Sequence, residues 1–89
     1  MRRVRVTATG RVQGVGFRVA ARSEALRLGV SGWIRNRDGD AVEAEIEGTS
    51  ADVDAMLEWM GRGPGTAAVT EVSVTDVAPT GGSGFDIRL

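Results

Sequence analysis

The spacing of hydrophobic positions along the first half of the chain predicts a strand, a helix and a second strand. Residues 3–9 alternate strictly between polar and apolar side chains, which is typical of a half-buried strand. From Phe17 onward the apolar positions recur at helical spacing, and Gly29 suits the left-handed position that follows a helix. Residues 30–37 then predict the second strand, and the Asp-Gly pair after it is a hairpin signal.

The second half of the chain predicts a strand, a helix and a further strand. Residues 41–47 alternate cleanly, with the apolar side chains facing a core and the glutamates facing outward. In the helix expected next, Ser50 is the predicted N-cap. Its apolar positions recur at intervals of three and four residues: Val53, Met56, Leu57 and Met60. A short strand is expected over residues 85–89, at the end of the chain.

The β-rich segment 68–79 does not keep a constant phase. Val72 and Val74 share one face by alternation, whereas Val69 and Val77 fall on the other. Such a slip predicts a β-bulge, although the pattern does not locate it.

This order predicts an α+β fold of the ferredoxin-like βαββαβ type, with two helices on one face of an antiparallel sheet and a short extra C-terminal strand. In the usual strand order the third strand lies between the first and the second, so these two run parallel and end at the same edge. The loop 11–16 would then lie two strand spacings, about 9–10 Å, from the second strand. Because Asn36 has the same parity as Ile34, we expect it to point toward the helix layer and the start of the first helix.

The segment 10–18, GRVQGVGFR, contains no side chain that can serve as an acid, a base or a nucleophile. Its glycines at 14 and 16 permit a positive φ and a close approach to the main chain. Successive N–H groups in such a turn form a concave nest for an anion, next to the free N–H groups of the helix start. Arg18 adds a guanidinium that can grip two phosphate oxygens. The segment therefore indicates a phosphate cradle, with glycines that serve only packing as the alternative.

Composition narrows the chemistry further. The 89 residues predict a single domain, 1–89, and include neither cysteine nor histidine. This excludes a disulfide framework, a thiolate metal site and a histidine general base. All eleven basic residues are arginine, and the formal net charge of −1 argues against a nucleic-acid binder that acts through bulk charge. No apolar leader or membrane-spanning stretch is present, so we expect a cytoplasmic protein without a membrane partner.

Two segments resemble the signatures of the acylphosphatase family. The first signature, roughly G-x-V-Q-G-V-x-F-R, is matched by Gly10, Val12, Gln13, Gly14, Val15, Phe17 and Arg18. The second, G-W-[VI]-x-N followed by a glycine turn and V-E, is matched by Gly32, Trp33, Ile34, Asn36, Gly39, Val42 and Glu43. The resemblance extends over nearly the whole chain, because the two signatures occur in order within one domain.

This resemblance implies a monomeric hydrolase without metal or cofactor, which splits small-molecule acyl phosphates into a carboxylate and inorganic phosphate. It implies that the phosphoryl group is bound by the loop residues Gln13, Gly14, Val15, Gly16, Phe17 and Arg18. It also implies that Asn36 orients the attacking water, so that Arg18 and Asn36 are the expected catalytic residues. A carboxylate leaving group needs no strong general acid, which agrees with the absence of histidine.

Two other functions remain open. One is the handling of carbamoyl phosphate by the same fold, as in the acylphosphatase-like domain of larger carbamoyl-transfer maturation proteins. The other is a non-catalytic ferredoxin-like module that binds RNA or a small ligand, although the predicted third strand carries no aromatic side chain for base stacking.

Several conspicuous side chains are expected to be structural rather than catalytic. The outward Glu43, Glu45 and Glu47 are interpreted as a solvated strand face, not as a carboxylate pair for acid–base catalysis. Phe17 is predicted to lie in the core. Trp33 is predicted to pack on the sheet, with contact to an acyl group as the lesser alternative.

Overall fold

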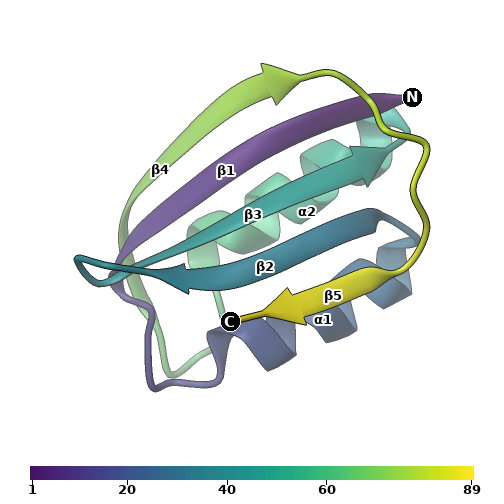
Figure 1. The fold of residues 1–89 in the computed structure, drawn as a ribbon. Helices are drawn as coiled ribbons and strands as arrows, with labels where there is room; N and C mark the ends of the chain where they lie inside the picture. Colours follow the sequence, from purple (N-terminus) through teal and green to yellow (C-terminus); the bar gives the residue numbers. More distant parts are fainter.

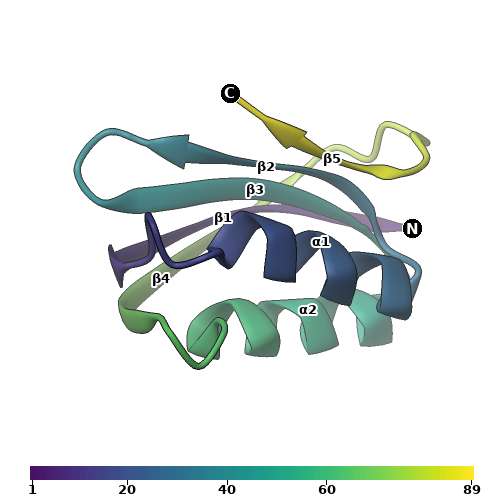
Figure 2. The same ribbon diagram turned by 90° about the horizontal axis from the view of Figure 1, so that it is seen from below.

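The computed structural model describes all 89 residues as one five-stranded sheet with two helices on one face (Figures 1 and 2). The elements follow one another as β1 (Arg2–Arg11), α1 (Phe17–Leu28), β2 (Ser31–Arg37), β3 (Ala41–Gly48), α2 (Ser50–Arg62), β4 (Ala68–Val77) and β5 (Phe85–Arg88). The predicted ferredoxin-like order with an extra terminal strand is confirmed. Neither helix combines the length and the apolar character needed to cross a membrane.

The order of strands across the sheet is β4-β1-β3-β2-β5. Strand β3 lies between β1 and β2 and is antiparallel to both, so β1 and β2 run in the same direction. Strand β5 adds parallel to β2 at the edge of the sheet. The C-terminal ends of β1, β2 and β5 consequently lie at the same end of the sheet, where α1 begins (Figure 1).

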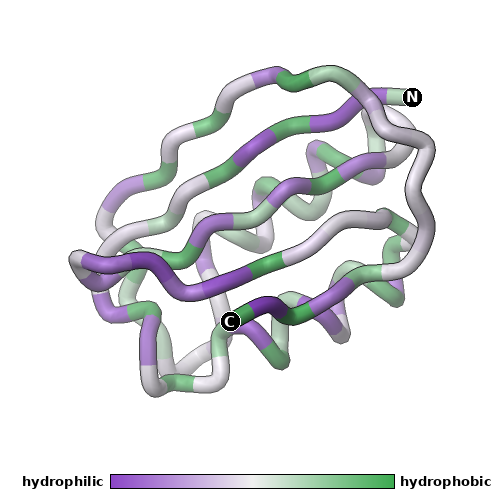
Figure 3. The backbone as a smooth tube through the Cα atoms, viewed as in Figure 1, coloured by the Kyte–Doolittle hydropathy of each residue, from purple (hydrophilic) through white to green (hydrophobic).

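The core lies between the sheet and the two helices. Apolar and polar residues alternate along β1 and β3 (Figure 3), and their helix-facing side chains are fully buried: Val4, Val6, Ala8, Val42, Ala44 and Ile46. Phe17 is 2% exposed and packs edge-on against Trp59, with ring centroids 5.3 Å apart, so its predicted core position is confirmed. Met56 and Met60 are buried as predicted, whereas Leu57 is only partly buried at the margin.

The predicted bulge lies in β4. Thr9 of β1 faces Glu71, but Gly10 faces Val69, so Thr70 has no partner across the ladder. This extra residue returns Val69 to the helix side, where it packs against the core together with Val72. The expectation that Val69 occupies the opposite face was wrong, because strict alternation fails across a bulge.

The N-terminus of α2 has the capping that isolated helices prefer. The Thr49 hydroxyl accepts a hydrogen bond from the Asp52 N–H at 3.2 Å, and the Asp52 carboxylate lies in the first turn, near the positive end of the helix dipole. The predicted cap, Ser50, is instead the first helical residue. The prediction was one residue late because both side chains can cap, and only the extended backbone of Thr49 decides between them.

The outer face of the sheet is not simply solvated, and this part of the interpretation was wrong. Glu43 and Glu47 are only 7% and 4% exposed. Arginines on the neighbouring strands pair with the three glutamates and cover them: Arg3 and Arg5 on β1, and Arg35 and Arg37 on β2. Cross-strand neighbours of opposite charge thus shield these carboxylates from water.

The carboxylate of Glu47 joins three parts of the chain. It accepts hydrogen bonds from the main-chain N–H groups of Thr80 (2.7 Å) and Gly81 (2.9 Å), and from the Arg3 guanidinium (3.2 Å). The N–H donors, Thr80 first, hold the pKa of Glu47 below its usual value. Glu47 thereby fixes the connection from β4 to β5, and with it the edge strand that reaches the site described next.

Candidate functional site

The loop between β1 and α1 leaves the start of α1 without the usual stabilising groups. Gly16 precedes the helix in a left-handed conformation (φ 77°, ψ 19°), and no side chain caps the helix. The first turn contains no acidic residue and instead carries Arg18, a cation where the helix dipole disfavours one. Helix α2 in the same chain has both features, so their absence here leaves the start of α1 able to receive an anion.

The main chain of this loop offers a continuous series of donors. None of the N–H groups from residue 13 to residue 19 donates a hydrogen bond within the protein, and the first that does belongs to Ala20, which bonds the Gly16 carbonyl at 3.1 Å. The Val15 carbonyl accepts the Thr66 hydroxyl at 2.7 Å. The C=O and N–H of a trans peptide point in opposite directions, so the Gly16 N–H points away from Thr66.

A hollow of about 170 Å³ lies between the loop, α1 and the ends of β2 and β5. Its lining residues are Val12, Gly14, Gly16, Phe17, Arg18, Val19, Asn36 and Ile87. None of them is acidic. The volume is below the roughly 300–1,000 Å³ of sites for drug-sized ligands, so the hollow suits a small anionic group whose remainder extends into solvent.

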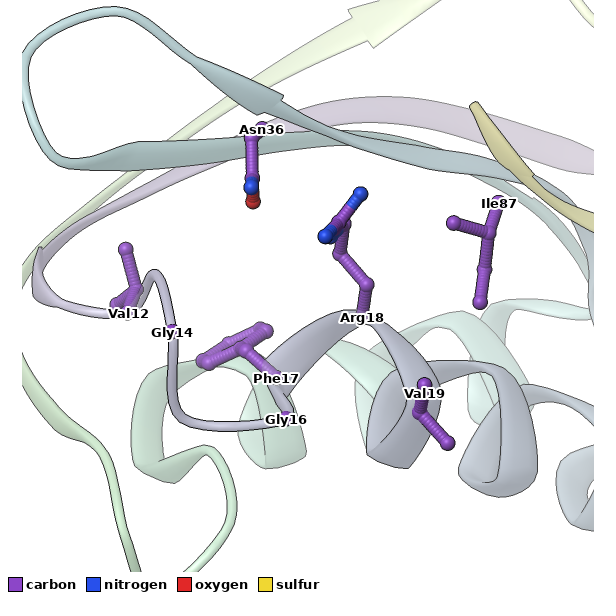
Figure 4. A pocket seen from close by; sticks show the side chains of 8 residues that line it. All are labelled: Val12, Gly14, Gly16, Phe17, Arg18, Val19, Asn36 and Ile87. Atoms are coloured by element: carbon purple, nitrogen blue, oxygen red, sulfur yellow. The ribbon is translucent and has the colours of Figure 1, made fainter. Parts of the chain in front are cut away.

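Two polar side chains approach this space from opposite sides. The Arg18 guanidinium rises from the first turn of α1, and the Asn36 carboxamide descends from β2 (Figure 4). The predicted position of Asn36 on the helix-facing side of β2 is confirmed, because its strand neighbour Ile34 is buried beneath the sheet.

Neither of these side chains has a hydrogen-bonding or ionic partner within the protein. Most other arginines do pair with carboxylates: Arg2, Arg3, Arg5, Arg27, Arg35 and Arg37. Arg18 and Asn36 are both half-buried, so their donors are partly shielded from water yet open to a ligand. The hollow is thus lined by a free guanidinium, a free carboxamide and loop residues whose N–H groups have no acceptor within the protein.

The structure brings together only part of the predicted phosphate-binding set. Gly14, Gly16, Phe17 and Arg18 line the hollow, whereas the side chain of Val15 packs against the core. Gln13 is engaged elsewhere. Its amide nitrogen donates to the carbonyls of Arg37 (2.5 Å) and Ala41 (2.9 Å) and ties the loop to the β2–β3 hairpin.

The tryptophan in the second signature lies away from the site. Trp33 faces the outer side of the sheet opposite Glu45, and its ring is flanked by the guanidiniums of Arg35 (5.3 Å) and Arg88 (4.8 Å). Packing on the sheet is therefore confirmed for Trp33, and the alternative contact with an acyl group was wrong because the sheet separates this ring from the hollow.

Sequence reasoning missed four residues that help to form the site. Val12, Val19 and Ile87 line the hollow, the last two being 66% and 39% exposed, and the Thr66 hydroxyl donates to the loop carbonyl of Val15. Parity with the buried Phe85 could have placed Ile87 on the helix side. Nothing in the local pattern signals Thr66, because its contact is 51 residues away along the chain. No group of three or more acidic side chains that could hold a metal ion is found.

Comparison with known proteins agrees with this geometry. The family model described as Acylphosphatase matches residues 4–87. A curated acylphosphatase of Anaeromyxobacter dehalogenans (strain 2CP-C) is 49% identical over 88 residues, which are 98% of this chain and 95% of that protein.

Solved structures are similar over the same extent. The crystal structure of acylphosphatase from Bacillus subtilis has a TM-score of 0.94 and 36% identity, with 100% of both chains covered. Full-length HypF in its phosphate- and nucleotide-bound form has a TM-score of 0.89 and 25% identity over 98% of this chain, but only 12% of that chain. Since both the family model and a relative at 49% identity span almost all of its residues, this chain belongs to the acylphosphatase family.

Proposed function

We propose that this protein hydrolyses the carboxyl–phosphate bond of acyl phosphates, giving a carboxylate and inorganic phosphate, and that the hollow at the start of α1 is its active site. One observation carries the assignment. Residues 14 and 16–19, whose N–H groups donate to nothing within the protein, line one space together with the unpaired guanidinium of Arg18 and the free carboxamide of Asn36, and no acidic side chain lines that space. Donors without acceptors are what a phosphoryl group requires.

In this proposal the phosphoryl group is bound by the loop and by Arg18. Its oxygens accept hydrogen bonds from the loop N–H groups, and the guanidinium grips two of them side by side. The dipole of α1 adds to the positive potential at the same point. The anion therefore replaces the capping side chain and the acidic first turn that this helix lacks.

Asn36 lies across the hollow from Arg18 and orients the attacking water. The water oxygen forms a bond to phosphorus while the bond from phosphorus to the carboxylate oxygen breaks. A proton of the water passes to a phosphoryl oxygen. The leaving carboxylate, with a pKa of about 4–5 by analogy with side-chain carboxyls, departs without a general acid.

Such a reaction needs positioning and electrostatic stabilisation more than acid–base groups. The transition state of phosphoryl transfer is loose, with charge spread over the equatorial oxygens. Fixed N–H donors and a guanidinium stabilise this charge without having to reorganise. This supports catalysis in a chain that has no histidine, cysteine or lysine.

In the bound substrate the acyl group would extend from the hollow toward solvent, along the exposed apolar side chains of Val19 and Ile87. This favours acyl groups with some apolar surface over carbamoyl phosphate, whose carbamoyl group is polar. Carbamoyl phosphate, left open by the sequence, is the second candidate substrate. The likeness to the phosphate- and nucleotide-bound form of full-length HypF supports a phosphate site in this fold, although it covers only 12% of that chain. An RNA-binding role is disfavoured, because the outer sheet face carries paired charges and its one tryptophan is only 9% exposed.

We also propose that the protein acts as a monomer, as its resemblance to the acylphosphatase family implies. A cytoplasmic location is part of the proposal and rests on the sequence alone.

Steady-state kinetics on benzoyl, acetyl and carbamoyl phosphate, with inorganic phosphate as a competitive inhibitor, test the proposed function. We expect turnover of at least the first two substrates, and light scattering should report a single chain. Absence of hydrolysis of all three by the folded wild-type protein would refute the assignment.

A further inference from the structure

The phosphate-binding loop is held from behind by a residue that is distant in sequence. Thr66, in the connection between α2 and β4, donates its hydroxyl to the Val15 carbonyl at 2.7 Å. Thr66 does not line the hollow. In Figure 2 the α2–β4 connection lies on the side of the loop away from the sheet, opposite the β2 strand that carries Asn36.

The peptide that this bond restrains would otherwise turn easily. It joins Val15 to Gly16, and Gly16 has a φ of 77° with no atom within 4 Å of where a Cβ would lie. Gly16 is therefore required for its backbone conformation, not for close packing, and the same freedom lowers the cost of rotating the peptide plane.

Rotation of this peptide plane would place a hydrogen-bond acceptor where the loop now presents a donor. In the observed orientation the Val15 carbonyl points to Thr66, so the Gly16 N–H points the opposite way, toward the hollow that Gly16 lines. After rotation the carbonyl oxygen would enter the hollow and repel a phosphoryl oxygen. The next peptide is fixed separately, because the Gly16 carbonyl accepts the Ala20 N–H of α1.

We propose that Thr66 is a positioning residue for phosphate binding, which holds the Val15 carbonyl outward and thereby aims the Gly16 N–H at the phosphoryl group. This inference rests on the proposed function, because it names the device that keeps that site in its binding orientation. The hydroxyl acts through the peptide and touches neither substrate nor water in the hollow.

Two substitutions separate the hydroxyl from the shape of the side chain. Thr66→Val removes the hydroxyl and keeps the branched form, whereas Thr66→Ser keeps the hydroxyl. Calorimetry with inorganic phosphate should show about three- to tenfold weaker binding for Thr66→Val. This is less than the 10²–10³-fold effect of deleting a donor outright, since the peptide still samples the orientation in which the Gly16 N–H points into the hollow. The kcat/KM for benzoyl phosphate should fall by at least as much, and Thr66→Ser should recover both to within about twofold of wild type.

Thr70→Val is the matched control. Thr70 is also exposed, and its hydroxyl donates to the Thr9 carbonyl at 3.2 Å, outside the hollow. This variant should bind phosphate as wild type does, even if both valine variants lose similar thermal stability.

The possible results distinguish a failure of the role of Thr66 from a failure of the proposed function. Wild-type phosphate affinity in Thr66→Val would overturn the inference, and so would a failure of Thr66→Ser to restore binding. If wild type hydrolyses no acyl phosphate while the phosphate affinities still divide between valine and serine, the positioning role stands and the proposed function fails.

Discussion

Arg18→Ala should weaken phosphate binding and turnover while leaving the stability of the fold unchanged or slightly higher. Arg18 has no hydrogen bond or ion pair within the protein and lies in the first turn of α1, which has no acidic residue. Removing a cation from this position relieves about 0.3–1 kcal/mol of unfavourable interaction with the helix dipole, and alanine is also the best helix former. We therefore expect the free energy of unfolding to stay constant or rise by about that amount, with a gain in Tm of about 4–8 °C per kcal/mol.

Phosphate binding should fall steeply in the same variant. Two unit charges about 4 Å apart interact by about 4 kcal/mol at an effective dielectric constant of 20 and about 1 kcal/mol in water. Because Arg18 is half-buried, we take an intermediate value of about 2 kcal/mol for each phosphate charge, or about 4 kcal/mol for a dianion. This corresponds to about 10³-fold weaker binding. The kcat/KM for benzoyl phosphate should fall by a similar factor.

The assays are urea unfolding followed by tryptophan fluorescence, calorimetry with inorganic phosphate, and steady-state hydrolysis of benzoyl phosphate. Arg11→Ala is the matched control, since Arg11 is exposed, has no ionic partner and does not line the hollow. Arg18→Lys keeps the charge without the fork and should give an intermediate loss. A fall in the free energy of unfolding of more than about 1 kcal/mol in Arg18→Ala, or a phosphate affinity within threefold of wild type, would refute the proposed role of Arg18.

Three further outcomes are expected. Asn36→Ala should reduce kcat about 10²–10³-fold while calorimetry still detects phosphate binding; ordinary turnover would disprove its role in orienting water. Ile87→Thr should lower the ratio of kcat/KM for benzoyl over acetyl phosphate about three- to tenfold, whereas Val74→Thr, at a 45% exposed strand position outside the hollow, should not change it. The folded pKa of Glu47 is depressed, so its contribution to stability is present above the unfolded pKa of about 4.3 and is lost as pH falls through the lower folded value. The urea midpoint should therefore decrease when the pH is lowered below about 4.3. Glu47→Gln should lower the midpoint at pH 7 and make its decrease at low pH smaller. If the midpoint of this variant depended on pH as in wild type, the role of this carboxylate would be contradicted.

The hydropathy pattern sufficed to predict which side chains of β1 and β3 face the core, because it reports which face of each strand is buried. The alternation in β1 and β3 predicted their inward residues, and the parity of Asn36 with Ile34 predicted its side of the sheet. The same method failed at Val69, since one extra residue in β4 reverses the parity. It also misjudged Glu43 and Glu47, because the solvation of a strand face depends on what its neighbouring strands carry.

The sequence by itself determined the order of the elements, the glycine-rich turn before α1 and Arg18 as a candidate, because these follow from local propensity and from short spacings. Asn36 became a candidate through its place in the second acylphosphatase signature. The tertiary structure alone decided how the donors are aimed. The Thr66 hydroxyl, 51 residues away, donates to the Val15 carbonyl, and Gln13 binds the β2–β3 hairpin and not the hollow. Local patterns do not reveal such contacts, since the partners lie far apart along the chain and a glycine leaves the backbone beside it several accessible conformations.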